Sequence, residues 1–248
     1  MGYRLKYDWH THTFYSHGLG SIEDNVIEAR KKGLESIAIT DHGPGHFGYG
    51  IRRKSIPLMR EEIERLREKY SDIRIYMSVE ANVINSSGML DVRPEEYDLY
   101  DFVIAGYHFG TLGENKIGSL LLHGRNLLGS WLGRYSESLI RKNTLIDVNS
   151  IDSNRIVTLT HPGDKGKVDL ERVFEACERT GTYLEISNRH RQLTTEEIRL
   201  AAGFDVKFIM GSDAHTPDRV GTCERAVARM LEAGLDPARV VNLEITDD

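Results

Sequence analysis

Residues 8–17 read DWHTHTFYSH and place three histidines directly after the strand that we expect at Leu5–Trp9. His10 and His12 are two positions apart, so on an extended strand their side chains point to the same side and can bind one ion. His17 follows on the expected loop. The stretch therefore predicts a strand whose carboxyl end carries metal ligands, as in a parallel barrel that builds its reactive face at the strand ends.

The same local context recurs along the chain, because five further strand-like runs end in His, Asp or Glu beside small or turn-forming residues. These strings are AITDHG (38–43), SVEAN (78–82), AGYHFG (105–110), LTHPG (159–163) and GSDAHT (211–216). The further candidate ligands are His42, Glu80, His108, His161, Asp213 and His215. Imidazole nitrogens and carboxylate oxygens together suit zinc, iron or manganese, and the two oxygens of Glu80 can bridge two ions. The recurrence predicts a multi-metal site.

Strand-like runs alternate with helical patterns along the whole chain, which is typical of repeated β-α units and a mostly parallel sheet. Seven strands are expected, at Leu5–Trp9, Ser36–Thr40, Ile73–Val79, Phe102–Ala105, Ile156–Thr160, Tyr183–Ile186 and Lys207–Met210. Helices are expected at Ser21–Lys32, after Pro57, and at Val168–Thr180, Thr194–Ala202 and Pro217–Ala233. The candidate ligands follow every expected strand except the sixth. We expect one α/β domain over residues 1–248.

One segment, Phe109–Gly133, does not follow this alternation of strands and helices. It contains several glycines and the apolar cluster SLLLHGRNLLGSWLG (119–133), and neither shows a clear helical or strand periodicity. We expect either a long irregular excursion that acts as a lid or a poorly formed pair of short helices. Because the segment directly follows His108, either structure would overhang the reactive face. Substrate selectivity is expected to lie here and in the loop after His42.

Composition limits the partners that the chain can have. The net charge of −6 argues against an extended nucleic-acid surface, which needs a basic stripe. No apolar run approaches the roughly 18 residues of a membrane span, and the amino terminus has no secretory signal pattern, so we expect a cytoplasmic protein without a membrane partner. Cys177 and Cys223 are not spaced as metal ligands. Bound divalent cations would still attract a small phosphorylated substrate to this acidic chain.

The strings HTHTFYSHG, ITDHG, VEAN, GYH, THPG and GSDAH resemble, in order and spacing, the motifs of the polymerase and histidinol phosphatase (PHP) superfamily. The resemblance runs from His10 to His215 and implies a distorted (β/α)7 TIM-like barrel with a trinuclear metal site and phosphoesterase activity. The implied ligand sets are His10, His12, Glu80 and Asp213 for one ion, Glu80, His108 and His161 for a second, and His17, His42 and His215 for the third. The length resembles the small stand-alone phosphatases of this family.

The expected reaction is hydrolysis of a small phosphate monoester by a hydroxide held between two of three divalent ions. Zinc is the expected metal, with manganese or iron as alternatives. Asp213 and His42 are expected to act beside this hydroxide. Arg189, just past the sixth strand, is expected to clamp the phosphate, although a solvated surface arginine fits the sequence equally well. The histidines expected outside the metal shell are His46, His123 and His190.

Three alternatives stay open at this point. The first is a histidinol phosphatase proper, since histidinol phosphate is one candidate among many small monoesters. The second is a metal-dependent amidohydrolase, which also starts a barrel with His-x-His, but which leaves His17, His42 and His215 without a role. The third is a non-catalytic, metal-stabilised scaffold, against which the complete ligand set argues. Neither the substrate nor the oligomeric state follows from the sequence.

Overall fold

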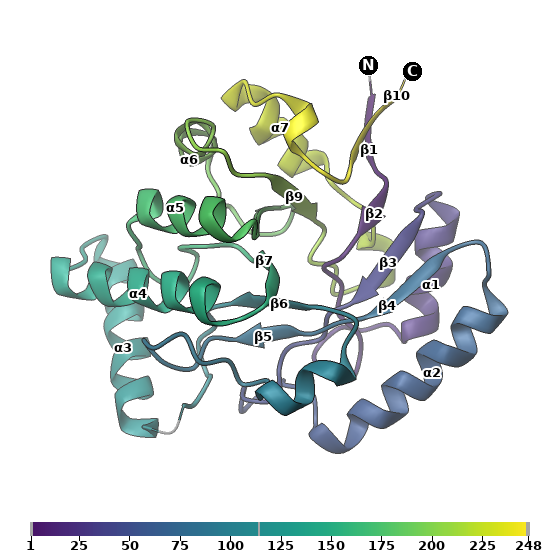
Figure 1. Ribbon diagram of the computed structural model, residues 1–248, viewed down its shortest axis with the longest axis horizontal. Helices are drawn as coiled ribbons and strands as arrows, with labels where there is room; N and C mark the ends of the chain where they lie inside the picture. Colours follow the sequence, from purple (N-terminus) through teal and green to yellow (C-terminus); the bar gives the residue numbers. More distant parts are fainter. Residues whose placement is uncertain (1, 114, 247–248) are drawn as a thin grey trace.

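The computed structural model describes residues 2–113 and 115–246, in which the strands form three sheets (Figure 1). The parallel three-stranded sheet contains β2 (Tyr7–Asp8), β3 (Ser36–Ile39) and β4 (Arg74–Met77). The parallel five-stranded sheet contains β5 (Glu80–Asn82), β6 (Val103–Gly106), β7 (Ile156–Leu159), β8 (Tyr183–Ser187) and β9 (Phe208–Gly211). Near the termini, β1 (Gly2–Leu5) and β10 (Leu243–Thr246) pair antiparallel. The expected α/β class with parallel sheets is confirmed.

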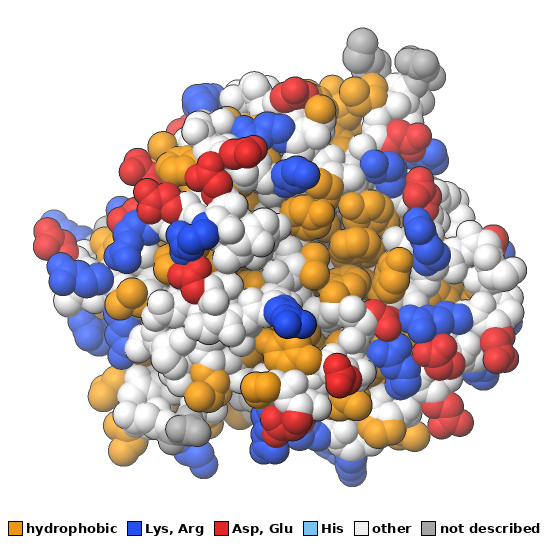
Figure 2. All heavy atoms as spheres, viewed as in Figure 1, with side chains coloured by type: hydrophobic (Ala, Val, Ile, Leu, Met, Phe, Trp, Pro, Cys, Tyr) orange, Lys and Arg blue, Asp and Glu red, His pale blue; other side chains and the backbone are white. Residues whose placement is uncertain are grey.

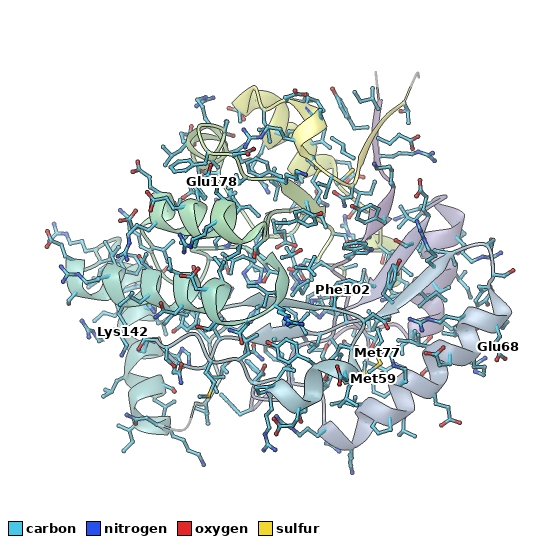
Figure 3. All side chains as sticks on the ribbon, in the orientation of Figure 1. Met59, Glu68, Met77, Phe102, Lys142 and Glu178 are labelled. Carbon is cyan, nitrogen blue, oxygen red and sulfur yellow. The ribbon has the colours of Figure 1, made fainter. Side chains whose placement is uncertain are left out.

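Helices pack along both parallel sheets (Figure 1). Their bounds are α1 (Ile22–Lys31), α2 (Ile56–Lys69), α4 (Glu137–Ser153), α5 (Leu170–Thr180), α6 (Thr195–Ala201) and α7 (Glu224–Ala233). Helix α1 begins where the sequence predicts, since the side chains of Ser21 and Asp24 each accept a hydrogen bond from the other residue's backbone N–H. Met59 of α2 and Met77 of β4 are fully buried where this helix packs on the sheet (Figure 3).

The two parallel sheets approach each other at both edges, but within the described residues they do not form one closed sheet. At one edge an isolated parallel bridge joins His42 to Glu80. At the other edge a second parallel bridge joins Thr11 to Ala214. The carboxyl ends of both sheets therefore meet around a common region, while a closed (β/α)7 barrel stays a prediction.

The expected third strand, Ile73–Val79, is shorter in the structure and is followed at the first of these edges by a short strand that the sequence did not predict. Strand β4 ends at Met77 and β5 begins at Glu80, in the other sheet. The backbone N–H of Glu80 donates to the carbonyls of Thr40 and Asp41. The chain thus passes from one sheet to the other at the residue that carries the candidate bridging carboxylate.

One helix, α3 (Lys116–Leu132), occupies most of the segment expected to be irregular, so that prediction is wrong. Gly133, with a φ of 62°, ends the helix in a left-handed conformation that glycine adopts readily. The helical period is hidden in the sequence because apolar side chains lie on both faces: Leu122 is buried, whereas Trp131 is exposed. A lid role for residues 109–133 stays a prediction. Within the described residues, no helix is both long enough and apolar enough to cross a membrane.

The helix expected at Pro217–Ala233 is shorter than predicted. Residues Pro217–Arg219 form a 3-10 turn, and α7 begins only at Glu224. Gly221 interrupts the helix with a φ of 73°, and its backbone N–H donates to the buried Asp8 carboxylate at 2.8 Å. This long-range hydrogen bond fixes the turn that follows the last strand end.

Candidate metal centre

Side chains from the carboxyl ends of the strands meet in one cavity. Its lining, within the described residues, consists of His17, His42, Tyr49, Glu80, His108, His161, Lys165, Arg189, His190, Asp213 and His215. His10 and His12 are buried against the carboxylates of this cavity. The structure therefore brings together all nine expected ligands, which the sequence spreads between positions 10 and 215.

Glu80 is the centre of this cluster and is fully buried. Five imidazole nitrogens surround its two oxygens at 2.9 to 3.7 Å, and they belong to His10, His12, His42, His108 and His161. Oε1 lies 3.0 Å from His161 Nε2, whereas Oε2 lies 2.9 Å from His42 Nδ1. Because the two oxygens face different histidines, the carboxylate has the geometry needed to bridge two ions.

Asp213 joins the other end of the cluster. Its Oδ1 atom lies 3.2 Å from His12 Nε2 and 3.2 Å from His215 Nδ1. The φ angles of Asp213 and His161, 50° and 31°, are positive, which costs a residue with a side chain about 1–3 kcal/mol. Such strain persists only where the surrounding structure holds the backbone, and it is concentrated at functional sites. The strained backbone at these two strand ends therefore holds the side chains of Asp213 and His161 in position within the cluster.

Many buried polar atoms of the cluster have no hydrogen-bond partner within the described part of the chain. Nine of sixteen such atoms are His10 Nε2, both ring nitrogens of His12 and His42, Glu80 Oε2, His108 Nδ1, Asp213 Oδ1 and His215 Nε2. Buried polar groups are nearly always paired, and an unpaired one costs about 1–3 kcal/mol. Even the 2.9 Å approach of His42 to Glu80 lacks hydrogen-bond geometry. Free imidazole and carboxylate lone pairs that converge in this way fit divalent ions such as zinc.

Glu80, Asp213 and His12 are in the protonation states that metal binding requires. Burial by itself would raise the pKa of Glu80, but neighbouring histidines, His108 foremost, outweigh it and hold that pKa well below its usual value. Burial would also raise the pKa of Asp213, and His10 with other neighbours lowers it well below its usual value. Burial lowers the pKa of His12 to about 3. At neutral pH these carboxylates are charged and His12 is neutral, which are the metal-binding forms.

Strand β8, the expected sixth strand, supplies the carboxylate of Glu185, which sequence reasoning missed. His10 Nδ1 lies 2.6 Å from Glu185 Oε1, and the backbone N–H of His161 donates to Oε2 at 2.9 Å. Burial by itself would lower the pKa of His10, but Glu185 and Glu80 raise it well above its usual value. A carboxylate on the far ring nitrogen fixes the orientation of a ligating histidine. Glu185 is thus a positioning residue for two candidate ligands.

The Glu185→Gln variant is expected to bind metal about 10- to 100-fold more weakly than the wild type, which is the typical loss for such a partner. Glutamine keeps an oxygen that can accept a hydrogen bond from the His10 ring, but it removes the charge that fixes the orientation of this ring and strengthens it as a metal ligand. Competition with a chelator of known affinity measures the change. Glu68→Gln, at an exposed position of α2 (Figure 3), removes the same charge away from the site and should have no effect. Equal metal affinity in both variants would contradict the role of Glu185.

Asp41 fixes the loop between two expected ligands. Its carboxylate accepts hydrogen bonds from the backbone N–H and the hydroxyl of Thr13, at 2.7 and 2.5 Å, and from the hydroxyl of Ser16 at 2.5 Å. The loop that follows His12 is thereby tied to the end of β3. This contact places the imidazole ring of His17 with its centroid 4.1 Å from that of His215.

His190, which is expected outside the metal shell, lines the cavity, and its exclusion from the metal ligands stays a prediction. Its Nε2 atom lies 3.1 Å from Asp213 Oδ2 and its Nδ1 atom 3.2 Å from Asp164 Oδ2. Burial by itself would lower the pKa of His190, but these two carboxylates raise it to about 9. His190 follows the end of β8, just as the other candidates follow the ends of their strands. This position was the feature of the sequence that could have indicated a place in the cavity. Arg189 and Lys165 also line the cavity.

The other two histidines expected outside the shell bind loop backbone. His46 Nε2 lies 2.6 Å from the carbonyl oxygen of Phe109, and His123 Nε2 lies 2.9 Å from that of Thr111. Their rings therefore hold the chain that leads into α3. Neither residue lines the cavity formed by the described residues.

Three groups of side chains bring their ligand atoms within 4.8 Å of one another. These groups are His10, His12 and Asp213, then His42, Glu80 and His108, and finally His12, His42 and His215. The first group matches part of one ligand set that the family resemblance implies. The other two place His42 with Glu80 and with His12, so the sets share members. The number of ions and their ligand sets stay predictions.

Comparison with known proteins identifies relatives along most of the chain. A family model described as the PHP domain matches residues 8–189. A probable phosphatase of Caldanaerobacter subterraneus subsp. tengcongensis is 28% identical over 260 residues, which cover 99% of this chain and 90% of that protein. A probable phosphatase of Shewanella sediminis is 26% identical over 258 residues, which cover 96% of this chain and 90% of that protein.

Two solved structures share the fold. The histidinol phosphate phosphatase of Lactococcus lactis subsp. lactis, complexed with zinc, L-histidinol and phosphate, has a TM-score of 0.62 and 18% identity, and the match covers 94% of this chain and 95% of that one. A putative histidinol phosphatase of Listeria monocytogenes has a TM-score of 0.60 and 14% identity, with 87% of this chain and 97% of that one covered. At these identities the likeness concerns the fold alone.

Proposed function

Because this chain belongs to the PHP domain family, we propose that it is a metal-dependent phosphatase that hydrolyses small phosphate monoesters. The enzyme class, a metal-dependent hydrolase, follows from the family and from relatives named probable phosphatases. One observation carries the proposal: seven histidines and two carboxylates converge at one cavity and leave nine buried polar atoms without a hydrogen-bond partner in the described residues.

In this proposal, three divalent ions bind the cluster, zinc ahead of manganese and iron. The first set is His10, His12, Glu80 and Asp213, the second is Glu80, His108 and His161, and the third is His17, His42 and His215. The opposed contacts of the two Glu80 oxygens support a bridge between ions. When bound, the ions would supply Lewis acidity toward the phosphate and a hydroxide nucleophile shared by two of them.

The remaining side chains of the cavity orient the substrate. Arg189 is assigned the phosphate clamp, because a guanidinium can bind two phosphate oxygens at once. Its Nε atom lies 4.0 Å from Asp213 Oδ2 and its side chain is 46% exposed, so it can reach a ligand at the mouth of the cavity. Lys165 adds a second cation from the loop after β7. Asp213 and His42 are assigned to the reacting centre, where they hold the ions in position.

The proposal treats the two parallel sheets as one interrupted (β/α)7 barrel. The bridges between His42 and Glu80 and between Thr11 and Ala214 support this view, because they bring the sheet edges into register near the cavity. The break between β4 and β5 would then be a local change in the strand that places the Glu80 carboxylate in the site.

The proposed substrate class is a small phosphate monoester. The Lactococcus lactis protein contains phosphate and L-histidinol, the two products that such a hydrolysis would give from histidinol phosphate. A histidinol phosphatase proper is therefore the narrower candidate. Sugar phosphates and nucleotides belong to the same reaction class, and a screen of phosphorylated metabolites against the metal-loaded protein would choose among them.

Metal analysis combined with chromogenic substrates tests the proposed function. We expect about three metal ions per chain together with release of phosphate from a chromogenic phosphate monoester. Turnover of an amide with no turnover of the phosphate ester would instead identify an amidohydrolase. Bound metal without turnover of any ester or amide would identify a non-catalytic scaffold.

The Arg189→Ala variant is expected to lose about 10- to 100-fold in kcat/KM, which corresponds to about 1.5–3 kcal/mol for a hydrogen bond to a charged group. Its metal content should stay that of the wild type, because Arg189 is not among the proposed ligands. Steady-state kinetics with a chromogenic ester and metal analysis measure the two effects. Arg191→Ala, at an exposed neighbouring position, is the control. Unchanged kinetics for Arg189→Ala would remove this residue from the phosphate site.

A further inference from the structure

Helix α3 presents a strongly apolar face to solvent. Seven large side chains on this helix are 53% to 81% exposed: Ile117, Leu120, Leu121, Leu127, Leu128, Trp131 and Leu132. The other six lie 3, 4, 10, 11, 14 and 15 residues after Ile117, which is close to whole turns of a helix with 3.6 residues per turn, so the seven form one stripe along the helix. The buried side of the helix is narrow and consists of Leu122, Asn126 and Gly129. Apolar side chains gather over α3 at the lower left of Figure 2.

The size of this stripe is that of a protein interface. At roughly 100 Å² of exposed apolar surface for each large side chain, seven side chains offer about 700 Å². A stable interface buries about 800 Å² on each partner, and the largest apolar patch on a typical monomer is about 300–600 Å². The stripe is therefore large enough to be the core of a stable contact with one partner.

The order of residues along the stripe is symmetric about Gly124, the central residue of α3. Leu121 and Leu127 lie three residues before and after Gly124, and Leu120 and Leu128 lie four residues before and after it. Ile117 and Trp131 lie seven residues before and after Gly124. When two such helices run antiparallel and cross at Gly124, each of these six apolar side chains faces an apolar side chain of the other copy, and Leu132 lies opposite Lys116. A symmetric sequence of this kind suits a two-fold interface, in which the same patch is used twice.

Gly124 is suited to a crossing point. It is exposed, and a side chain built at this position would meet no atom of the described residues within 4 Å. The absence of a side chain lets two helix backbones approach closely, and the distance between packed helices depends on the side chains at their contact.

The charges of α3 also fit a second copy. Its residues 116–132 include Lys116 and Arg125 but no acidic side chain. In the antiparallel arrangement Lys116 of each copy lies near the carboxyl end of the other copy's helix, where a cation is favoured. We propose that two copies of this chain form a dimer through α3, as an antiparallel pair of helices that cross at Gly124.

Sedimentation equilibrium tests the dimer with the full chain. We expect a mass of about 56 kDa, twice the 28.2 kDa of one chain, across the micromolar range. The double variant Leu121→Lys, Leu128→Lys should sediment as a monomer, because it places four cations in the interface. Leu58→Lys, which makes the same change at a 56% exposed position of α2, should stay dimeric. Circular dichroism would show that all three proteins are folded.

Cysteine cross-linking tests the arrangement of the pair. Under mild oxidation the Gly124→Cys variant should form a disulfide-linked dimer, because its two Cα atoms would lie within about 7 Å. The Trp131→Cys variant should not, because its two positions would lie about 21 Å apart along the antiparallel helices. The native Cys177 and Cys223 are buried and should not interfere.

Several results would overturn the proposal. These are a wild-type chain that stays monomeric, a double variant that dimerises like the wild type, and an absence of cross-linking at position 124. Cross-linking at both positions would indicate a parallel pair and would contradict the proposed arrangement. A monomer that binds vesicles of phosphatidylcholine and phosphatidylserine, and loses this binding in the double variant, would identify a lipid surface as the partner instead.

Discussion

The Glu80→Gln variant is expected to lose about 1,000-fold or more in kcat/KM for a phosphate monoester, equivalent to about 4 kcal/mol. Glutamine has nearly the same size as glutamate, but it carries no charge and has only one acceptor oxygen. Five imidazole nitrogens approach the Glu80 carboxylate, so the substitution removes the negative charge at their centre. Steady-state kinetics and elemental analysis of the same sample measure the loss of turnover and of metal.

A matched control separates this effect from a general change of charge. Glu68→Gln makes the same chemical change at an exposed position of α2 (Figure 3) and should keep the activity and metal content of the wild type. Urea unfolding would establish that the Glu80→Gln variant is folded. Turnover of the folded Glu80→Gln variant at a rate close to that of the wild type would contradict a central role for this carboxylate.

Removal of metal by a chelator is expected to lower the Tm by about 5–10 °C for each tightly bound ion. An ion present at a hundred times its Kd stabilises the folded state by about 2.7 kcal/mol, and 1 kcal/mol shifts the Tm of a chain of this length by about 2–4 °C. The buried atoms that have no hydrogen-bond partner among the described residues explain the direction, because removal of metal takes away the ion that would satisfy them. Thermal unfolding followed by circular dichroism, before and after dialysis against chelator, measures the shift.

Return of metal provides the control for this experiment. Zinc should restore the Tm of the stripped wild-type protein, whereas magnesium, which prefers oxygen ligands and keeps its waters, should restore much less. The Glu80→Gln variant should respond more weakly to chelator and to zinc. A wild-type Tm that does not change when all metal is removed would show that the cluster is stable without ions.

Much of the fold and most of the candidate site followed from local sequence. Parallel strands end at one edge, so a run of strand ends that carry His, Asp or Glu predicts that these side chains converge. His10 and Asp213 are far apart in the chain, yet their spacing from the ends of their strands was sufficient to place both in the same cluster.

What the sequence did not predict depends on long-range contacts. Glu185 supports His10 across 175 positions of the chain, and nothing in its own strand indicates that contact. His190 was set aside because it lies in a polar run, although it follows a strand end as the other candidates do. Helix α3 was missed because its exposed face is apolar, which removes the contrast between faces that marks a helix. A second copy that covers this face would explain why the exposed side of α3 is apolar.

The most direct test of a metal-dependent phosphatase is phosphate release from a chromogenic monoester, measured on one sample while bound metal is removed and returned. We predict that turnover falls in proportion to the metal lost and returns when zinc, manganese or iron is added back. Full turnover by a chain shown by elemental analysis to hold no metal would contradict the account.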